Sequence, residues 1–378
     1  MRRKTSAGRS VVKSRFFQKY LLPGFVFQSL VIAGGYGTGR ELVQFFLRLG
    51  PITGLLAMGV TTLIWSAVAA SSFELARLTK SYDYRTFFTH LLGRGWFFYE
   101  ILYFLQGFLV LAVVAAAAGA ILHETFGAPS LVGVIGMMVA IGFLTLRGTQ
   151  VIERFLASWS FVLYAAYGVF FVWCWSRFGD AIVAGLSGST IGQGWLLGGV
   201  TYAGYNLQMI PAILFCMRHS ETRRQALGAG ALTGPIAMLP GLLFYVSMVG
   251  QYPAILSEAV PANVLLELVG SRAFQIVFQV VLFGTLIETG AGLVHAVNER
   301  LAATYAERGL EMPVLLRPAI AIGMLSIGAL SAQVGLKELI ESGYGTITWG
   351  FIIVFVIPVL TLGVWKILQA HHASLSKY

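Results

Sequence analysis

Charged residues are scarce in this sequence: Asp, Glu, Lys and Arg make up 11% of its 378 residues, while hydrophobic residues make up 57%. Soluble domains carry roughly 25% charged residues, so this composition excludes an ordinary water-soluble enzyme. The mean hydropathy of +0.77 excludes intrinsic disorder. The 44 glycines follow no collagen-like period. What remains is a polytopic membrane protein.

Motifs of cofactor and metal chemistry are also absent. The sequence has no GxxxxGK[ST] motif for ATP and neither HExxH nor a Cys/His cluster for a metal. Its two cysteines, Cys174 and Cys216, lie in apolar runs without ligand-like spacing, so we interpret both as small buried residues. No small-residue cleavage site follows the first apolar run, which we expect to be retained. We therefore expect neither an enzyme nor a resident cofactor.

Ten apolar runs are long enough to form membrane-spanning helices. About 20 helical residues cross a hydrocarbon core of ~30 Å. The runs cover residues 20–49, 52–77, 97–123, 129–147, 153–177, 194–217, 227–250, 272–297, 314–335 and 345–368. The segment 253–270 is too polar and too interrupted by proline to span, so we expect an external loop with one or two short helices.

The basic residues test this topology independently, because Lys and Arg gather in short cytoplasmic loops. With the N-terminus inside, 21 of the 26 Lys and Arg residues fall on the cytoplasmic side and four outside, and Arg40 lies within a helix. The bias predicts ten helices with both termini cytoplasmic. It also explains the net charge of +10 by the anionic inner leaflet, with no need for a nucleic acid partner.

Two of the predicted helices carry matching weak points. Gly34–Gly39 holds four glycines in six residues, and Gly198–Asn206 in the sixth helix is similarly glycine-rich, with Gln208 and Pro211 just beyond. Each glycine costs a helix about 1 kcal/mol relative to alanine, so we expect unwound segments there. Interrupted first and sixth helices of ten indicate an inverted five-plus-five repeat with a transport site near the midplane. The alternative is that these glycines only permit close helix packing.

These features predict an all-α integral membrane protein with one transporter domain, 19–368. Its repeats would cover about 19–178 and 190–368, and residues 1–18 and 369–378 would be cytoplasmic tails.

The string GGYGTGRE followed by LVQFF, together with ETGAG in the eighth helix, is similar to the YkvI-like bacterial membrane proteins, a group classed as amino acid permeases. The helix number and order resemble the LeuT-type fold of the amino acid, polyamine and organocation transporter superfamily. The resemblance implies a bacterial inner-membrane protein whose glycine-rich first helix holds a substrate carboxylate. It also implies a sodium site between carbonyls near Ala33 and Tyr36 and hydroxyls of Thr285 or Thr289.

Ionisable residues at membrane depth are costly and need a reason. Glu288 shares one face of the eighth helix with Thr285, Thr289 and Gly292, which is a polar stripe on an otherwise apolar helix. We interpret Glu288 as a proton-binding carboxylate or cation ligand, the alternative being a neutral buried glutamate that fixes packing. Because Glu288 precedes Thr289, the helix lacks the paired hydroxyls typical of sodium-coupled relatives, and the coupling ion, sodium or a proton, stays open.

Arg40 and Glu41 directly follow the glycine run. Either Arg40 pairs across the cavity with Glu288 and Glu41 binds a substrate amine, or both pair locally or reach toward the outer surface. Free N–H groups of Gly37, Thr38 and Gly39 are expected to form an anion site for a substrate carboxylate. The full set of candidate substrate residues is Gly35, Tyr36, Gly37, Thr38, Gly39, Tyr103, Gln106, Tyr202, Tyr205 and Asn206, and that for ion coupling is Ala33, Tyr36, Thr285, Glu288 and Thr289.

The sequence thus predicts a secondary transporter that moves a small amino-acid-like or zwitterionic substrate by alternating access, coupled to a proton or sodium. The alternative is a receptor of the same fold that binds its ligand without moving it.

Overall fold

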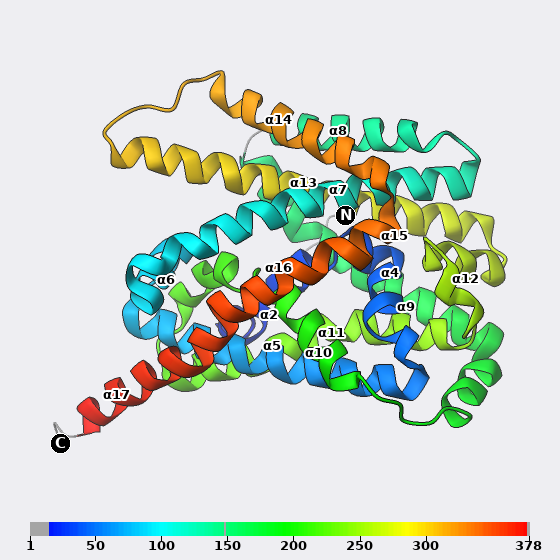
Figure 1. The fold of residues 1–378 in the computed structure, drawn as a ribbon, viewed down its shortest axis with the longest axis horizontal. Coiled ribbons are helices and arrows are strands. Elements are labelled where there is room, and N and C mark those ends of the chain that lie inside the picture. The colour runs from blue at the N-terminus through cyan, green and yellow to red at the C-terminus, as the bar shows by residue number, and fades with distance from the viewer. Residues whose placement is uncertain (1–14, 147–148, 376–378) are drawn as a thin grey trace, which may run out of the picture.

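The computed structural model describes residues 15–146 and 149–375, and within them the chain is helical, with no strand (Figure 1). The principal helices are α2 (Leu22–Val31), α3 (Gly34–Thr38), α4 (Arg40–Phe45), α5 (Pro51–Thr79), α6 (Tyr84–Leu92), α7 (Trp96–Phe126), α8 (Ser130–Leu146), α9 (Thr149–Ser187), α10 (Trp195–Leu207), α11 (Arg223–Val249), α12 (Pro261–Val269), α13 (Arg272–Glu307), α14 (Leu316–Ser331), α15 (Leu336–Glu338), α16 (Tyr344–Phe351) and α17 (Val364–Leu375). Short 3-10 or π segments join them: η1 (Phe17–Leu21), η2 (Leu47–Leu49), η3 (Gly93–Gly95), η4 (Pro211–His219), η5 (Ala254–Ser257), η6 (Ala332–Val334), η7 (Leu339–Gly343), η8 (Ile352–Val356) and η9 (Val359–Gly363).

The described residues hold seven helices that are long and apolar enough to cross a membrane. Three of the ten predicted runs do not meet this measure. The runs 20–49 and 194–217 are interrupted, and α8 is an apolar helix of only 17 residues. The segment 253–270 was predicted correctly to contain short helices, since it holds η5 and α12. The helix α6 was not predicted.

The first helix is interrupted just before its glycine run and again at the last glycine of that run. Ile32 (ψ 85°) and the extended Ala33 (φ −110°, ψ −163°) separate α2 from α3. Gly39, with φ +85°, separates α3 from α4, a left-handed conformation that favours glycine. The predicted interruption is therefore present, but within it Gly34–Thr38 forms one compact helical turn. Gly34 in this turn packs on the Val113 carbonyl of α7.

The sixth helix also breaks later than predicted. Gly198–Asn206 is helical as part of α10, and the irregular turn falls at Gln208–Ile210, ahead of η4. The α10 glycines serve close packing: a Cβ at Gly199 would lie 2.6 Å from the Ala57 carbonyl oxygen of α5. The packing interpretation is thus correct for these glycines, and Pro211 begins η4 beyond the break.

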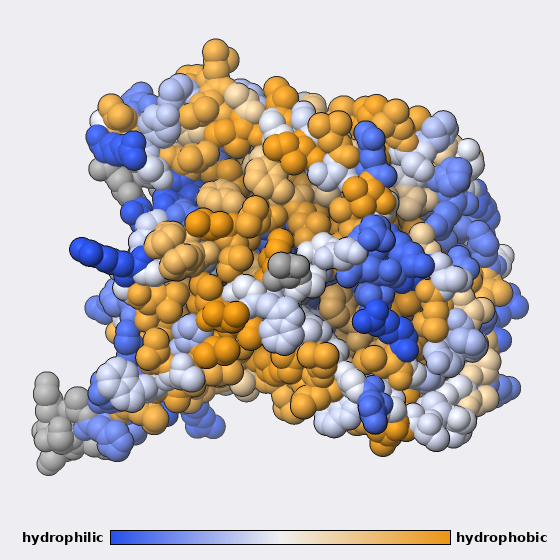
Figure 2. All heavy atoms as spheres, in the orientation of Figure 1, coloured by the Kyte–Doolittle hydropathy of each residue, from blue (hydrophilic) through white to orange (hydrophobic). Residues whose placement is uncertain are grey.

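The break in the first helix is surrounded by longer helices. α11 packs along α5 and α2, α10 packs on α5 and α16, and α3 packs on α7 and α13. At the top of Figure 1, α8 and α14 lie side by side. Apolar side chains cover most of the face shown in Figure 2, and hydrophilic ones gather mainly toward its left and right margins. This surface suits a lipid environment.

Candidate functional site

A buried carboxylate lies beside the break in the first helix. Glu41, on α4, is 0% exposed. The Tyr202 hydroxyl donates to its Oε2 at 3.3 Å, and the Tyr205 hydroxyl donates to its Oε1 at 3.5 Å. Both tyrosines lie on α10. The Tyr344 ring of α16, which is 0% exposed, stacks on the Tyr205 ring with centroids 4.0 Å apart. We call Glu41 and these three tyrosines the Glu41 cage.

Further buried aromatic side chains pack against the Tyr202 ring of the Glu41 cage. The Tyr202 ring contacts Phe46, with centroids 4.7 Å apart, and Trp65, with centroids 5.8 Å apart. Tyr202 and Trp65 are each 0% exposed. Among the ion pairs of the described residues, none includes Glu41. A buried charge is ordinarily paired, so this carboxylate is the unusual feature of the site.

The glycine run brings Glu41 against the first turn of α3. A Cβ placed on Gly35 would lie 2.3 Å from Glu41 Oε1 and 2.6 Å from its Cγ, so only glycine admits the carboxylate here. The expected free N–H groups are not all present. Gly37 N donates to Ala33 O at 2.8 Å and Gly39 N donates to Tyr36 O at 3.0 Å. The prediction of an open anion site is therefore wrong at Gly37 and Gly39, because the α3 turn uses their donors.

The remaining residues of α3 hold this turn in place. Thr38 Oγ1 donates to Gly34 O at 2.8 Å, and Tyr167 of α9 donates to Gly37 O at 3.2 Å. The Tyr36 hydroxyl donates to Ala237 O of α11 at 3.3 Å. The side chains of Tyr36 and Thr38 are thus committed to the protein.

Arg40 does not pair with Glu288, contrary to one of the two interpretations of the sequence. Its guanidinium donates to Glu341 Oε1 at 2.8 Å and to the carbonyl oxygens of Leu256 and Glu258, each at 2.9 Å. Arg40 is 2% exposed, whereas the Glu341 side chain is 30% exposed. Arg40 therefore ties α4 to η7 and to the η5 loop, and the consecutive residues Arg40 and Glu41 face different partners.

Three predicted residues lie outside the Glu41 cage. Tyr103 on α7 stacks with Tyr84 and Tyr99, with ring centroids 6.0 Å from each. Gln106 is buried and its amide forms no hydrogen bond with the described residues. Asn206 Nδ2 donates to Tyr202 O at 3.2 Å, a contact within α10. None of these contacts connects the three residues to Glu41.

The polar stripe of α13 is buried, as predicted, but its side chains differ in whether they have hydrogen-bond partners. Thr285 accepts a hydrogen bond from Trp159 Nε1 at 3.1 Å and donates to Val281 O at 3.0 Å. Glu288 Oε1 and Thr289 Oγ1 are buried without a hydrogen-bond partner among the described residues. Thr285 is therefore a poorer ion ligand than its spacing suggested, and Glu288 with Thr289 keeps free coordinating oxygens.

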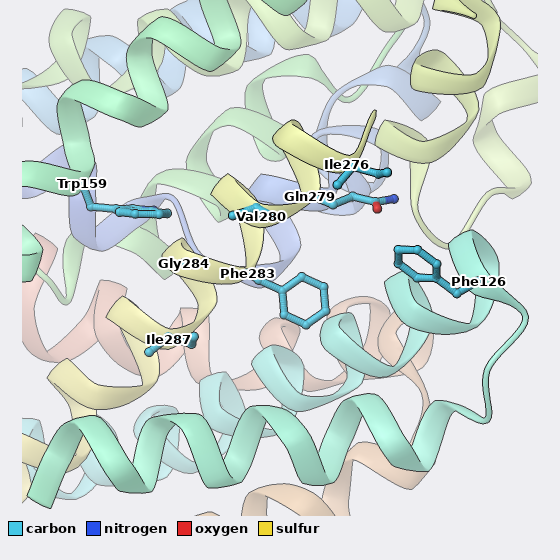
Figure 3. Close-up of a pocket in the computed structure, with 8 residues that line it drawn as sticks. All are labelled: Phe126, Trp159, Ile276, Gln279, Val280, Phe283, Gly284 and Ile287. Atoms are coloured by element: carbon cyan, nitrogen blue, oxygen red, sulfur yellow. The ribbon is translucent and has the colours of Figure 1, made fainter. Parts of the chain in front are cut away.

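A groove of about 360 Å³ is lined by α13, by Phe126 at the end of α7 and by Trp159 of α9, whose indole also donates to Thr285 (Figure 3). Phe126, Val280 and Phe283 give it an apolar lining. Its mouth includes Ile276 and Val280, which are 42% and 59% exposed. None of the predicted site residues lines this groove. The apolar side chains at its rim are compatible with contact to lipid.

Sequence reasoning missed the residues of the tenth helix. Glu341 and Tyr344 lie before 345–368, the run from which that helix was predicted, although the helical segment begins at Leu336. The signal that could have found Glu341 is a charge balance, because buried Arg40 needs an anion and the predicted topology places Glu341 at the same end of the bundle. No pattern in the sequence points to Tyr344.

The chain resembles known membrane proteins in sequence and in fold. No family model matches it. It is 23% identical over 340 residues to the uncharacterized membrane protein YkvI of Bacillus subtilis, with 85% of this chain and 89% of YkvI covered. Among solved structures, MhsT in complex with L-phenylalanine superposes with a TM-score of 0.58 at 16% identity, covering 94% of this chain and 98% of MhsT.

A variant of the manganese transporter of Eremococcus coleocola superposes with a TM-score of 0.55 at 16% identity, covering 93% of this chain and 80% of that one. Proteins of such different cargo share this architecture, so the fold does not identify a substrate. The resemblance predicted from the motifs is confirmed: the chain is a membrane protein similar to YkvI, with the LeuT-type fold of secondary transporters.

Proposed function

We propose that this protein is a secondary active transporter that binds a small amine-bearing substrate, such as an amino acid or a similar zwitterion, at the Glu41 cage. The observation that carries the proposal is a fully buried carboxylate without a cationic partner, beside the interrupted first helix. Intramembrane carboxylates with this burial mark substrate or ion pathways. Discontinuous helices near the midplane are the usual place for such sites in transporters.

The residues around the site have separable roles in this proposal. Glu41 pairs with the substrate ammonium, and the hydroxyls of Tyr202 and Tyr205 orient its two oxygens. Arg40 and Glu341 close the site toward the side that carries the η5 loop, which the charge bias places outside. Alternating access then requires the Arg40–Glu341 pair to open on one side and a second closure to open on the other.

The ten-helix topology belongs to the same proposal. In it, the two interrupted helices and α8 span together with the seven long apolar helices. The bias of 21 basic residues to four supports cytoplasmic termini in a bacterial inner membrane.

Counterflow in proteoliposomes tests the proposal directly. Vesicles preloaded with each member of an amino acid and amine panel are assayed for uptake of the labelled compound, with and without a proton or sodium gradient. Exchange of at least one compound supports a transporter. A ligand that binds tightly but is never exchanged favours the receptor, and a steady ohmic current indicates a channel.

Removing the guanidinium at position 40 is expected to open the outer side. Arg40→Met keeps an unbranched apolar stem but loses the contacts to Glu341, Leu256 O and Glu258 O. The variant Thr38→Cys places a thiol at a fully buried position one turn before Glu41. We expect Arg40→Met to raise the alkylation rate of this thiol by up to about a hundredfold, since breaking a buried pair costs roughly 3 kcal/mol.

The alkylation measurement uses a membrane-impermeant maleimide, with the native Cys174 and Cys216, which are both buried, providing the background rate. An unchanged rate in the double variant contradicts the assignment of Arg40 to the outer closure.

Glu288 is proposed as the coupling carboxylate. Glu288→Gln keeps the volume of the side chain but removes its ability to hold a proton or a cation. We expect uptake to lose its dependence on the proton or sodium gradient while counterflow persists, because exchange does not require net movement of the coupling ion. Unchanged pH and sodium dependence of uptake would remove Glu288 from coupling.

A further inference from the structure

We propose that the substrate is an organic cation that carries an ammonium group and no carboxylate. This inference rests on the proposed function and narrows it, since the sequence alone favoured a zwitterion. The sequence predicted that a substrate carboxylate binds at the glycine run of the first helix. The inference follows from the group that occupies this position in the structure.

That place is filled by the protein's own carboxylate. The Cβ position of Gly35 is 2.3 Å from Oε1 and 2.7 Å from Cδ of Glu41, so the Glu41 carboxyl group lies directly on the α3 turn. A second carboxylate here would face a like charge in a site with little water. Two carboxylates that share such a site oppose each other's ionisation strongly. The α3 turn is therefore a poor place for a substrate anion.

Two of the donors expected to hold a substrate carboxylate are also committed elsewhere. The N–H groups of Gly37 and Gly39 are bonded to carbonyls of the same turn. The adjacent cation, Arg40, directs its guanidinium to Glu341 and two loop carbonyls. Its remaining Nε forms no hydrogen bond but is buried within this group. No free positive charge remains beside Glu41 on α3 or α4.

The Glu41 cage itself matches an ammonium group. One carboxylate supplies the opposite charge, and the hydroxyl oxygens of Tyr202 and Tyr205, 3.3 and 3.5 Å from that carboxylate, can accept hydrogen bonds from the ammonium. Glu41 is 0% exposed and Tyr205 is 4% exposed, so water is largely excluded. The buried negative charge and the hydroxyl acceptors both favour a monovalent organic cation.

Matched sets of ligands test the proposal on the purified full-length protein in lipid nanodiscs. Each set holds an amine, the corresponding amino acid and the corresponding acid. We use ethylamine, alanine and propionate; isopentylamine, leucine and 4-methylpentanoate; and phenethylamine, phenylalanine and 3-phenylpropionate. Binding is measured by calorimetry. We expect at least one amine to bind about tenfold or more tightly than its amino acid, and no acid to bind, because the carboxylate faces Glu41.

Variants then assign the binding to the Glu41 cage. Glu41→Gln, which keeps the shape of the side chain, is expected to weaken amine binding by about a hundredfold, because the ammonium loses its buried counter-charge. Tyr205→Phe keeps the ring and is expected to weaken it only severalfold. Glu311→Gln, at an exposed loop position, is the matched control and should bind as the parent does.

Three results overturn the proposal: no amine binds at millimolar concentration, every amino acid that binds does so at least as tightly as its amine, or Glu41→Gln binds the amine as the parent does. Its failure is distinguishable from failure of the proposed function. Counterflow of an amino acid without amine binding preserves the transporter and removes the substrate class. Amine binding without counterflow preserves the substrate class and removes transport.

Discussion

Gly35→Ala should abolish substrate binding and exchange without touching a charged residue. The new methyl group would lie 2.3 Å from Glu41 Oε1 and 2.6 Å from its Cγ, so the carboxylate must leave its position on the α3 turn. A displaced Glu41 loses its contacts with the hydroxyls of Tyr202 and Tyr205. Misplacing one partner of a buried ion pair costs roughly 3 kcal/mol, or about a hundredfold in affinity. Ligand binding and counterflow measure this loss.

Gly59→Ala is the control for that experiment. A Cβ at Gly59 on α5 meets no atom within 4 Å, so this alanine should leave binding and exchange unchanged. Normal exchange by Gly35→Ala would show that the Glu41 carboxylate need not rest on this turn, and would contradict the site.

Gly230→Ala is expected to have the largest effect on stability. The added Cβ would lie 2.2 Å from Ala70 Cα and 2.3 Å from Ala70 N, so it meets backbone atoms of α5 that no side-chain rotation can move. The helices α5 and α11 must separate along their length, and overpacking of this kind costs about 1–3 kcal/mol. Close backbone approach at small residues is a main source of helix association in membranes.

The thermal unfolding midpoint in detergent, followed by tryptophan fluorescence, measures this effect. The expected result is a clear decrease for Gly230→Ala and none for Gly59→Ala, which lies on the facing helix but in open space. Equal midpoints for the two variants would mean that the α5–α11 contact is not close in the folded protein.

Much of the fold could be predicted because the membrane imposes strong rules on sequence. The apolar runs located the long helices, and the polar, proline-containing segment 253–270 was correctly separated from them. The positions of the helix breaks were less predictable. Glycine content reports low helix propensity, but whether a glycine unwinds a helix or packs it depends on its neighbours. Gly199 has the Ala57 carbonyl against it and stays helical, whereas Ile32 and Ala33, with ordinary propensities, form the break.

The site was predictable in part for the same reason. Charged residues are rare in this sequence, and each ionisable group at membrane depth needs a partner. Arg40, Glu41 and Glu288 could therefore be identified as candidate site residues from the sequence. The partners themselves are set by tertiary contacts. Glu341 lies 301 positions from Arg40 in the chain, and no local pattern links them. A resemblance to carriers of amino acids likewise suggested a substrate carboxylate, whereas the packing of Glu41 on Gly35 argues for an amine.

The shortness of α4 has a consequence for how the outer closure and the substrate site influence each other. This helix has six residues and lies between Gly39, with φ +85°, and Phe46, with φ −125° and ψ −60°. It is therefore a short helical unit whose backbone leaves helical geometry at both ends. Its first two residues carry the contact to Glu341 and the contact to the Glu41 cage. No rotation of this unit moves one contact alone. If substrate binds at the Glu41 cage as proposed, thermodynamic reciprocity requires that it strengthens the Arg40–Glu341 pair by the same factor by which that pair strengthens substrate binding.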